Sequence, residues 1–298
     1  MKDLLGYMMI LKSLYYKIFG KFYERKMVSH NILFSYYDNL KINKETLIMF
    51  HGFSSNKEEC LPIAYDLSKK YRVIIPDLVG HGETLVLNQE EEFDFSLEKQ
   101  LEYLYGFIIR NVDKRNKIHI MGHSMGGLIA GCFAAKYPEL IKSVNLICPA
   151  GITMPNPSPV YSHYINTEEN LLSLKTPDDV KNLLHLNHCL YTYLPKFIFQ
   201  YYSDQYNING DIYDSIFEEV IINNYSYLDS QLAKIQSKIL VLWGDDDLII
   251  DKSCILVLLH NITVEANVFI IREAGHIINT SHSGVCAKYI SSHIEKNK

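Results

Sequence analysis

The sequence lacks the features that mark several large classes of protein. Its 298 residues carry a formal net charge of −5, so there is no basic surplus to attract nucleic acid, and we expect none to bind. The six cysteines are far apart and form neither a C-x-x-C pair nor a closely spaced disulfide scaffold, which is typical of reduced, mostly buried thiols. No Walker loop, H-E-x-x-H or Rossmann glycine motif occurs, so the sequence predicts neither a metal nor a cofactor.

The N-terminal segment also lacks a long hydrophobic run. Apolar residues recur at helical spacing from Leu4 to Phe22, and basic residues share another face. Lysines interrupt this pattern before the ~20 apolar residues that a spanning helix needs, and no cleavage site of a signal peptide follows. We therefore predict an amphipathic helix over residues 1–28, whose residues 4–25 either contact a membrane surface or pack on the chain's own domain. The expected location is intracellular, peripheral on a membrane in the first case and cytoplasmic in the second.

Short β-branched or aromatic runs alternate with helical patterns from about residue 30, which is typical of a mostly parallel sheet flanked by helices. The predicted strands are 33–37, 47–50, 73–76, 118–121, 144–147, 239–243 and 268–271. Residues 153–230 break this alternation, because they show only helical patterning with many aromatics. We predict that they form a helical cap, or lid, between the two parts of an α/β core, residues 29–152 and 231–298. Such a cap would cover the carboxyl ends of the strands, where open α/β sheets bind ligands.

The strongest local signal is the G-x-S-x-G pentapeptide at residues 122–126. It follows the apolar strand 118–121 and precedes a helical pattern, which is the context of a nucleophile elbow. The glycines allow a tight turn that projects the hydroxyl of Ser124 from the end of the sheet. We therefore interpret Ser124 as a nucleophile, and we expect the backbone N–H of Met125 to stabilise the oxyanion that its attack creates.

A serine hydroxyl needs a base, and the base needs an orienting carboxylate. His276 lies directly after the last predicted strand, 268–271, as the chain order Ser, Asp, His requires, so we predict that it is the base. Four aspartates follow the strand 239–243 and are candidates for the acid: Asp245, Asp246, Asp247 and Asp251. Their spacing alone does not decide among them.

Three further loops resemble those of the α/β-hydrolase superfamily. The sequence W-G-x-x-D at 243–247 resembles the acid turn of that superfamily, which implies that Asp247 is the acid. The H-G-x turn at 51–53 implies that the second oxyanion N–H comes from Phe53, with its ring as a wall of the pocket. A D-x-x-G-H-G loop at 77–82 implies that Asp77 and His81 build the site and are not a second catalytic pair.

A wider resemblance covers about residues 15–295. The chain resembles the monoacylglycerol lipase branch of the α/β-hydrolase-domain-containing proteins, specifically its member six. The matching segments are His51-Gly52-Phe53-Ser54, Ser124-Met125-Gly126-Gly127, Cys148-Pro149-Ala150-Gly151 and Thr176-Pro177-Asp178-Asp179. Two departures are the absence of that branch's longer apolar N-terminal anchor and His123, where the branch has threonine.

This resemblance implies a serine hydrolase of carboxylic esters, most specifically a monoacylglycerol lipase that releases fatty acid and glycerol through an acyl-serine intermediate. Its partner would be a lipid ester, and no cofactor is implied. We expect Phe53, Tyr193 and Phe197 to contact this substrate. Two alternatives stay open: a soluble hydrolase of small esters or carbon–carbon bonds with the same triad, and a catalytically silent fold that acts as a ligand receptor.

Overall fold

The computed structural model describes residues 13–87, 93–113, 115–187 and 194–297, and its centre is a nine-stranded, mostly parallel sheet. The strand order is β1-β2-β4-β3-β6-β7-β8-β9, and the short β5 pairs with β2. All pairs that involve β2 are antiparallel, and the neighbours from β4 through β9 are parallel. The strands are β1 Tyr23–Ser29, β2 Ile32–Asp38, β3 Thr46–Phe50, β4 Arg72–Pro76, β5 Leu85–Val86, β6 Ile118–His123, β7 Ile141–Ile147, β8 Lys238–Gly244 and β9 Ala266–Ile271.

The seven strands that the sequence predicts are confirmed, with ends that differ by three residues or fewer. The central strands read as almost continuous apolar runs because helices cover both faces of a parallel sheet. Ile48 in β3 lies beside Ile74 and Ile120, and Val144 continues the row to Ile239. A row of β-branched side chains therefore crosses five strands and fixes their register.

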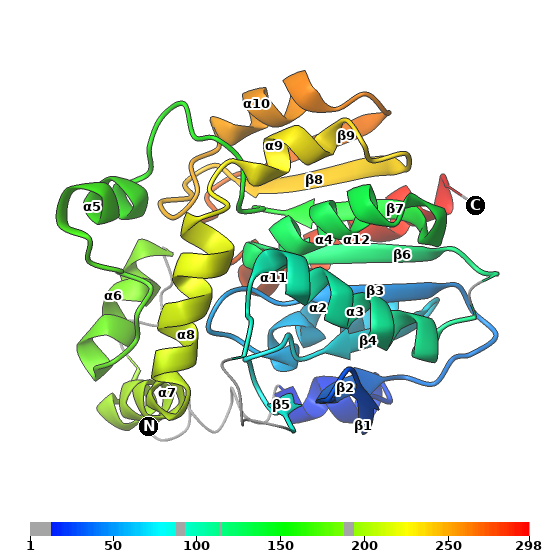
Figure 1. Cartoon of the computed structure of the whole chain (residues 1–298), viewed down its shortest axis with the longest axis horizontal. Coiled ribbons are helices and arrows are strands. Elements are labelled where there is room, and N and C mark those ends of the chain that lie inside the picture. Colours follow the sequence, from blue (N-terminus) through cyan, green and yellow to red (C-terminus); the bar gives the residue numbers. More distant parts are fainter. Residues whose placement is uncertain (1–12, 88–92, 114, 188–193, 298) are drawn as a thin grey trace.

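Two groups of helices cover the two faces of this sheet (Figure 1). On one face α3 contacts α4, α4 contacts α9 and α9 contacts α10, while α2, α11 and α12 contact one another on the other face. These helices are α2 Leu61–Leu67, α3 Leu97–Asn111, α4 Met125–Lys136, α9 Tyr227–Leu232, α10 Cys254–Asn261, α11 Ile278–Ser281 and α12 Ser283–Glu295. All of α4 is buried except its last two residues, because its side chains are small or apolar on every face. The start of α4 is thus held firmly at the end of β6.

Between β7 and α9 the described residues form helices and turns, and we call residues 153–230, which end within the sheet-packed α9, the cap segment. Its helices are α5 Pro159–Thr167, α6 Pro177–Leu186, α7 Lys196–Ile208, α8 Gly210–Ile216 and the π-helical η4 Phe217–Ile222. Proline occupies the first position of α5 and α6, after the N-caps Ser158 and Thr176. A small apolar cluster lies within the segment: Leu174, Val180, Leu194, Ile198, Phe199, Tyr206 and Tyr213. In Figure 1 these helices lie beyond one end of the sheet.

The predicted helix over residues 1–28 is wrong in its last part. The described helix covers residues 13–19 and ends at Gly20, and β1 then pairs with β2 along its whole length through a turn at His30 and Asn31. Both turn residues have positive φ, as hairpin turns of this length require. The strand β1 was not predicted because it is an edge strand exposed on both faces, so apolar and polar side chains do not alternate along it.

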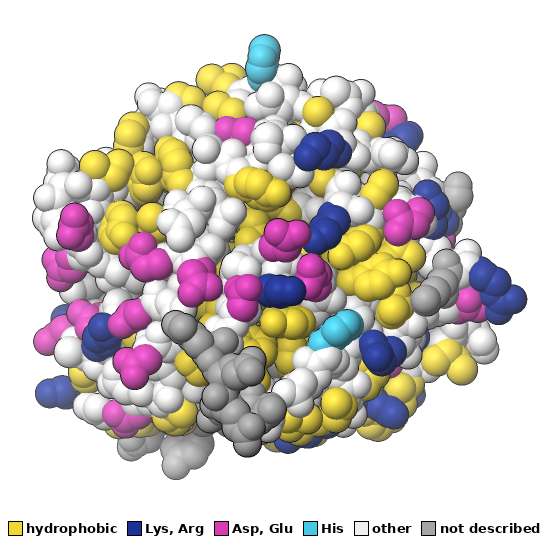
Figure 2. Space-filling model, viewed as in Figure 1, with side chains coloured by type: hydrophobic (Ala, Val, Ile, Leu, Met, Phe, Trp, Pro, Cys, Tyr) yellow, Lys and Arg dark blue, Asp and Glu magenta, His cyan; other side chains and the backbone are white. Residues whose placement is uncertain are grey.

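The surface in the view of Figure 2 mixes acidic, basic and hydrophobic side chains, which agrees with the small net charge. Among the described residues, no helix is both long and apolar enough to cross a membrane.

Candidate active site

The elbow at the end of β6 holds Ser124 in a strained backbone conformation. Its φ of 54° and ψ of −120° lie outside the regions that residues with a side chain prefer. The conformation is held from both sides, because the Ser124 N–H donates to the Ile147 carbonyl and the Ser124 carbonyl accepts from Ala150 N–H. The side chain of Ser124 lines a cavity under the cap segment. The serine is therefore presented to a ligand space at the start of α4.

Two glycines make this turn sterically feasible. A Cβ atom at Gly122 would lie 1.9 Å from the carbonyl oxygen of Gly126, and one at Gly126 would lie 2.4 Å from the carbonyl oxygen of His51. Both contacts are with backbone atoms, which have no room to move aside. The close approach of β6, α4 and the loop after β3 thus depends on the absence of both side chains.

The structure joins His276 and Asp247 although 29 residues separate them. Nδ1 of His276 donates to Oδ2 of Asp247 at 2.8 Å, and both residues are buried. Oδ1 of Asp247 accepts the N–H groups of Ile249 and Ile250, each at 2.9 Å, which fixes the carboxylate. Nε2 of His276 is buried and has no hydrogen-bond partner among the described residues. The geometry is that of an imidazole oriented by a carboxylate, with its second nitrogen left to accept a proton.

The other three aspartates of this turn also lie among the described residues. Oδ1 of Asp245 accepts Ala274 N–H, Oδ1 of Asp251 accepts Ser253 N–H, and Asp246 is exposed. Of the four aspartates, Asp247 is the one that binds the His276 ring.

The loop after β3 is anchored on both sides of Phe53. The Gly52 N–H donates to Oε2 of Glu59 at 3.1 Å, and the Ser54 N–H donates to Nε2 of His81 at 3.2 Å. Burial lowers the pKa of His81 to about 3, so its ring stays neutral and keeps an acceptor for this bond. The Phe53 amide thus lies between two fixed neighbours, and its side chain lines the same cavity as Ser124.

Met125, the other expected oxyanion donor, is the first residue of α4. The first residues of a helix have no carbonyl four positions earlier inside the helix to accept their N–H groups. The helix dipole adds a positive partial charge at this end. An anion beside Ser124 would therefore meet a favourable field.

The loop after β4 uses its polar groups to hold itself together. Asp77 accepts from Lys57 Nζ at 2.8 Å and from the N–H groups of Lys57 and Glu83, while His81 accepts from Ser54. These are bonds within and between loops, as the sequence resemblance implies for Asp77 and His81. Burial lowers the pKa of the neighbouring His51, which accepts from Leu78 N–H.

One group among the described residues has donor atoms close enough to bind a metal: Cys148, Asp247 and His276. Burial, with the Asp247 charge as a further cause, raises the pKa of the Cys148 thiol well above its usual range. A metal-binding cysteine must be a thiolate, and Asp247 already accepts three hydrogen bonds. The donor set fits an Asp–His pair beside a neutral thiol better than it fits a metal site.

The cavity beside Ser124 encloses about 680 Å³, a volume that includes space open to solvent. Its walls come from the loops at the ends of the strands and from the cap segment, and they are almost entirely apolar or aromatic. The cap contributes Met154, Val160, Tyr161, Tyr164, Asn170, Leu172, Phe217, Ile221, Ile222 and Tyr225. Of these residues, only Tyr161 and Tyr164 could have been found from local sequence. They lie three residues apart, just after the proline-capped start of α5.

Of the three residues expected to contact substrate, the structure describes Phe53 and Phe197. Phe197 lies on α7 with 52% of its surface exposed and is not among the lining residues, so the structure does not bring it to Ser124. Tyr193 lies outside the described residues. Phe53 does line the cavity. The aromatic composition of the cap could not indicate which helix face turns inward.

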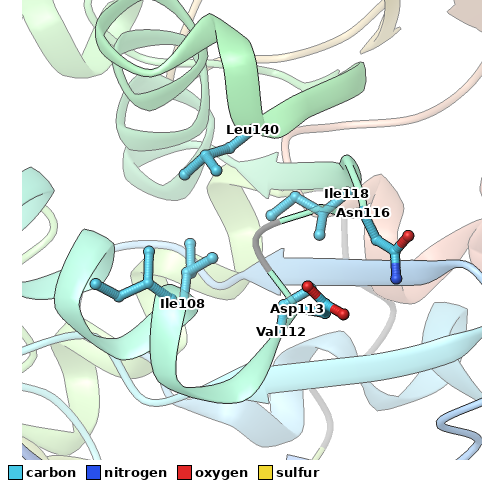
Figure 3. Close-up of a pocket in the computed structure, with 7 residues that line it drawn as sticks. Ile108, Val112, Asp113, Asn116, Ile118 and Leu140 are labelled. Carbon is cyan, nitrogen blue, oxygen red and sulfur yellow. The ribbon is translucent and has the colours of Figure 1, made fainter.

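A second, smaller cavity of about 200 Å³ lies at the other end of β6 from Ser124 (Figure 3). Mostly aliphatic side chains line it, including Ile108, Ile118 and Leu140. Its acidic residue, Asp113, is paired with Arg115. It carries no nucleophile or base.

The chain is similar to several known proteins. A monoacylglycerol lipase of Xenopus laevis is 27% identical over 86% of this chain and 80% of its own length. Lipase 1 of Psychrobacter immobilis is 30% identical over 81% of this chain and 74% of its own length. Among solved structures, a bacterial membrane phospholipase A superposes with a TM-score of 0.85 at 24% identity, covering 98% of this chain and 92% of its own.

A meta-cleavage product hydrolase from Pseudomonas fluorescens has the same fold, with a TM-score of 0.76 at 19% identity over 92% of this chain and 98% of its own. The family described as alpha/beta hydrolase fold matches residues 45–283. The predicted fold class, a mostly parallel sheet flanked by helices, is therefore confirmed, and the chain belongs to the alpha/beta hydrolase fold family.

Proposed function

We propose that the chain is a serine hydrolase that cleaves carboxylic esters, with monoacylglycerols as its main substrates. The observation that carries this proposal is the strained Ser124 at an apolar cavity, within a fold that also holds a buried Asp247–His276 pair. Relatives named monoacylglycerol lipase and lipase support ester hydrolysis. The cavity walls support a lipid substrate, since one acyl chain would bury its methylene groups there at about 0.8 kcal/mol each.

In the first step, Nε2 of His276 takes the proton of Ser124 Oγ as this oxygen attacks the ester carbonyl carbon. Asp247 stabilises the imidazolium that forms, through the bond from Nδ1. The negative charge on the carbonyl oxygen is met by the N–H groups of Phe53 and Met125. His276 then gives its proton to the departing glycerol oxygen, which leaves an acyl-serine.

In the second step, water replaces the alcohol. His276 removes a proton from the water as it attacks the acyl-serine carbonyl, and the same two N–H groups hold the second oxyanion. Collapse of this intermediate releases the fatty acid and restores the Ser124 hydroxyl. Loss of one oxyanion donor typically costs about 2.7–4 kcal/mol of barrier, so these two amides should affect kcat more than any one contact from the cap.

We further propose that residues 153–230 act as a lid that selects the acyl chain. The support is that cap side chains form much of the wall around Ser124, while α6 and α7 enclose an apolar cluster of their own. Tyr161 and Tyr225 stack with ring centroids 4.3 Å apart, and both line the cavity.

A peripheral membrane contact through the N-terminal segment is also proposed. The helix over 13–19 is tied to the fold, since Ser13 and Lys17 both bind the Glu58 carboxylate. It nevertheless exposes apolar side chains, with Ile18 at 59% and Phe19 at 64%. Exposed basic residues follow in β1, so the surface suits anionic lipid.

The test of this contact is cosedimentation with phosphatidylserine vesicles. Less Phe19→Glu than wild type should sediment with the vesicles, whereas equal sedimentation of the two proteins would contradict the contact.

The test of the substrate is hydrolysis of a monoacylglycerol series against short p-nitrophenyl esters, with the wild type and Ser124→Ala side by side. Preference for long-chain monoacylglycerol that disappears in the variant supports the proposal. Activity on short esters alone would support a serine hydrolase but contradict the lipase assignment. Ligand binding without hydrolysis of any ester would instead favour a receptor.

A further inference from the structure

Glu59 is a mostly buried carboxylate that contacts three of the loops around Ser124. It lies in the 3₁₀ helix η1, Lys57–Cys60, and its side chain is 14% exposed. Oε2 accepts the Gly52 N–H at 3.1 Å in the loop that carries Phe53. Oε1 accepts from His123 Nδ1 and from Asn279 Nδ2, each at 2.7 Å. Asn279 lies three residues after His276, so one carboxylate joins the oxyanion loop, the elbow and the base loop.

His123 extends this connection to the backbone of the base itself. Its Nδ1 faces the Glu59 carboxylate, and its Nε2 faces the carbonyl oxygen of His276 at 3.1 Å. Both of these groups are acceptors only, and a neutral imidazole has one donor nitrogen. The ring therefore satisfies both contacts only as the imidazolium. The His123 and His276 rings lie close together, with centroids 4.9 Å apart.

We infer that Glu59 and a charged His123 are positioning residues for ester hydrolysis: their ion pair holds the Phe53 amide, Ser124 and His276 in register. This inference rests on the proposed roles of Ser124 and His276. Neither Glu59 nor His123 exchanges a proton with substrate. Their positions affect the rate of hydrolysis because a shift of about 1 Å in a reacting group can lower a rate by about 100-fold.

The charge on His123 gives the inference a pH signature. The charged or titratable groups around it are Glu59 and His51 on one side and His276 and Asp247 on the other. Burial by itself lowers the pKa of His123, but the Glu59 carboxylate, the His276 carbonyl and Asp247 together raise it. Burial raises the pKa of Glu59, and His123 outweighs this and lowers it to about 2. Both shifts therefore favour the ionised form of the pair.

Above the raised pKa of His123 the ring loses a proton, and one nitrogen lone pair then faces either the carboxylate or the His276 carbonyl. We expect kcat to fall on this alkaline side. The profile of kcat against pH should thus show an alkaline limb that belongs to His123.

The test measures kcat and KM for a short p-nitrophenyl ester across acid to alkaline pH, with Ser124→Ala as the blank for uncatalysed hydrolysis. In Glu59→Gln the alkaline limb should move down by about 1–3 pH units, because an opposite charge in contact has been removed. In His123→Asn that limb should disappear, and kcat should fall about 10- to 100-fold with KM little changed. The matched control is Glu58→Gln, the neighbouring carboxylate in η1, which binds the N-terminal helix instead.

Thermal unfolding of each variant shows whether it is folded, and His123→Asn carries the test if Glu59→Gln is unstable. An alkaline limb that is unchanged in folded His123→Asn or Glu59→Gln would overturn the inference and leave the serine hydrolase intact. Activity that persists in Ser124→Ala would instead overturn the proposed function itself.

Discussion

Asp247 has two separate tasks at the level of single atoms. One oxygen holds the His276 ring, and the other caps two backbone N–H groups of its own turn. Asparagine keeps an oxygen for the turn, but its amide would face His276 Nδ1 and favour the wrong tautomer. We expect Asp247→Asn to fold normally and to lose about 10⁴ in kcat, the loss known for the same change in a serine protease.

Asp246→Asn is the matched control, because Asp246 is exposed in the same turn. Steady-state kinetics on a p-nitrophenyl ester compares the two. Equal activity of the two variants would contradict the assignment of Asp247 as the acid of the triad.

Sequence reasoning reached Ser124 and His276 because each lies at a fixed place relative to a strand. The resemblance was needed to select Asp247 from four nearby aspartates. Nothing in the sequence indicated that Glu59 and His123 form a pair, since 64 residues separate the two and neither belongs to a motif with a charge-pairing role. Contacts of this kind are properties of packing, and local sequence does not encode them.

At the scale of elements, the elbow depends on how closely β6, α4 and the loop after β3 approach. Gly122→Ala would put a methyl group 1.9 Å from the Gly126 carbonyl oxygen. We expect at least about 3 kcal/mol loss of unfolding free energy, or failure to fold, because backbone must shift. Chemical denaturation measures the change. Gly284→Ala in α12 is the control, since its Cβ meets nothing within 4 Å and should be neutral or stabilising.

The cap segment makes a prediction about chain length. Ile221 in η4 lines the cavity, and tryptophan there would fill part of the space that a long acyl chain needs. Ile221→Trp should reduce kcat/KM for long-chain monoacylglycerol by about 10-fold or more, with short esters little affected. Ile208→Trp, on α7 and 70% exposed, should change neither. A parallel loss for all chain lengths in Ile221→Trp would contradict the selective role.

The elements themselves were predictable to different degrees, for physical reasons. Central strands and α4 were found because burial on every side leaves continuous apolar runs. β1 was missed because its side chains are exposed on both faces. The inward faces of the cap helices were not predictable, because tyrosines and isoleucines lie on several sides of them. Exposed Tyr201 and buried Tyr206 on α7 look alike in sequence.

At the scale of the whole molecule, several buried histidines make the fold sensitive to acid. Burial lowers the pKa of His119 to about 4 and that of His81 to about 3, so both are neutral in the folded state at mildly acid pH. In the unfolded chain histidine binds a proton below about pH 6.5. The unfolded state therefore binds more protons, and the free energy of unfolding must fall as pH drops from about 6.5 towards 4.

Each such histidine contributes a slope of at most about 1.4 kcal/mol per pH unit. The free energy of unfolding, measured by denaturation across this pH range, should change less steeply with pH in His119→Gln than in the wild type. His260→Gln, at an exposed position at the end of α10, should leave the slope unchanged. An equal slope in all three proteins would show that His119 is not neutral when folded.

The central claim is that Ser124 is a nucleophile activated by His276. The direct measurement is covalent labelling with a fluorophosphonate, with the modified peptide located by mass spectrometry in the wild type, Ser124→Ala and His276→Ala. We predict one phosphonyl group on Ser124, none anywhere in Ser124→Ala, and labelling at least about 100-fold slower in His276→Ala. An adduct on another residue, or an unlabelled wild type that is folded, would contradict the account.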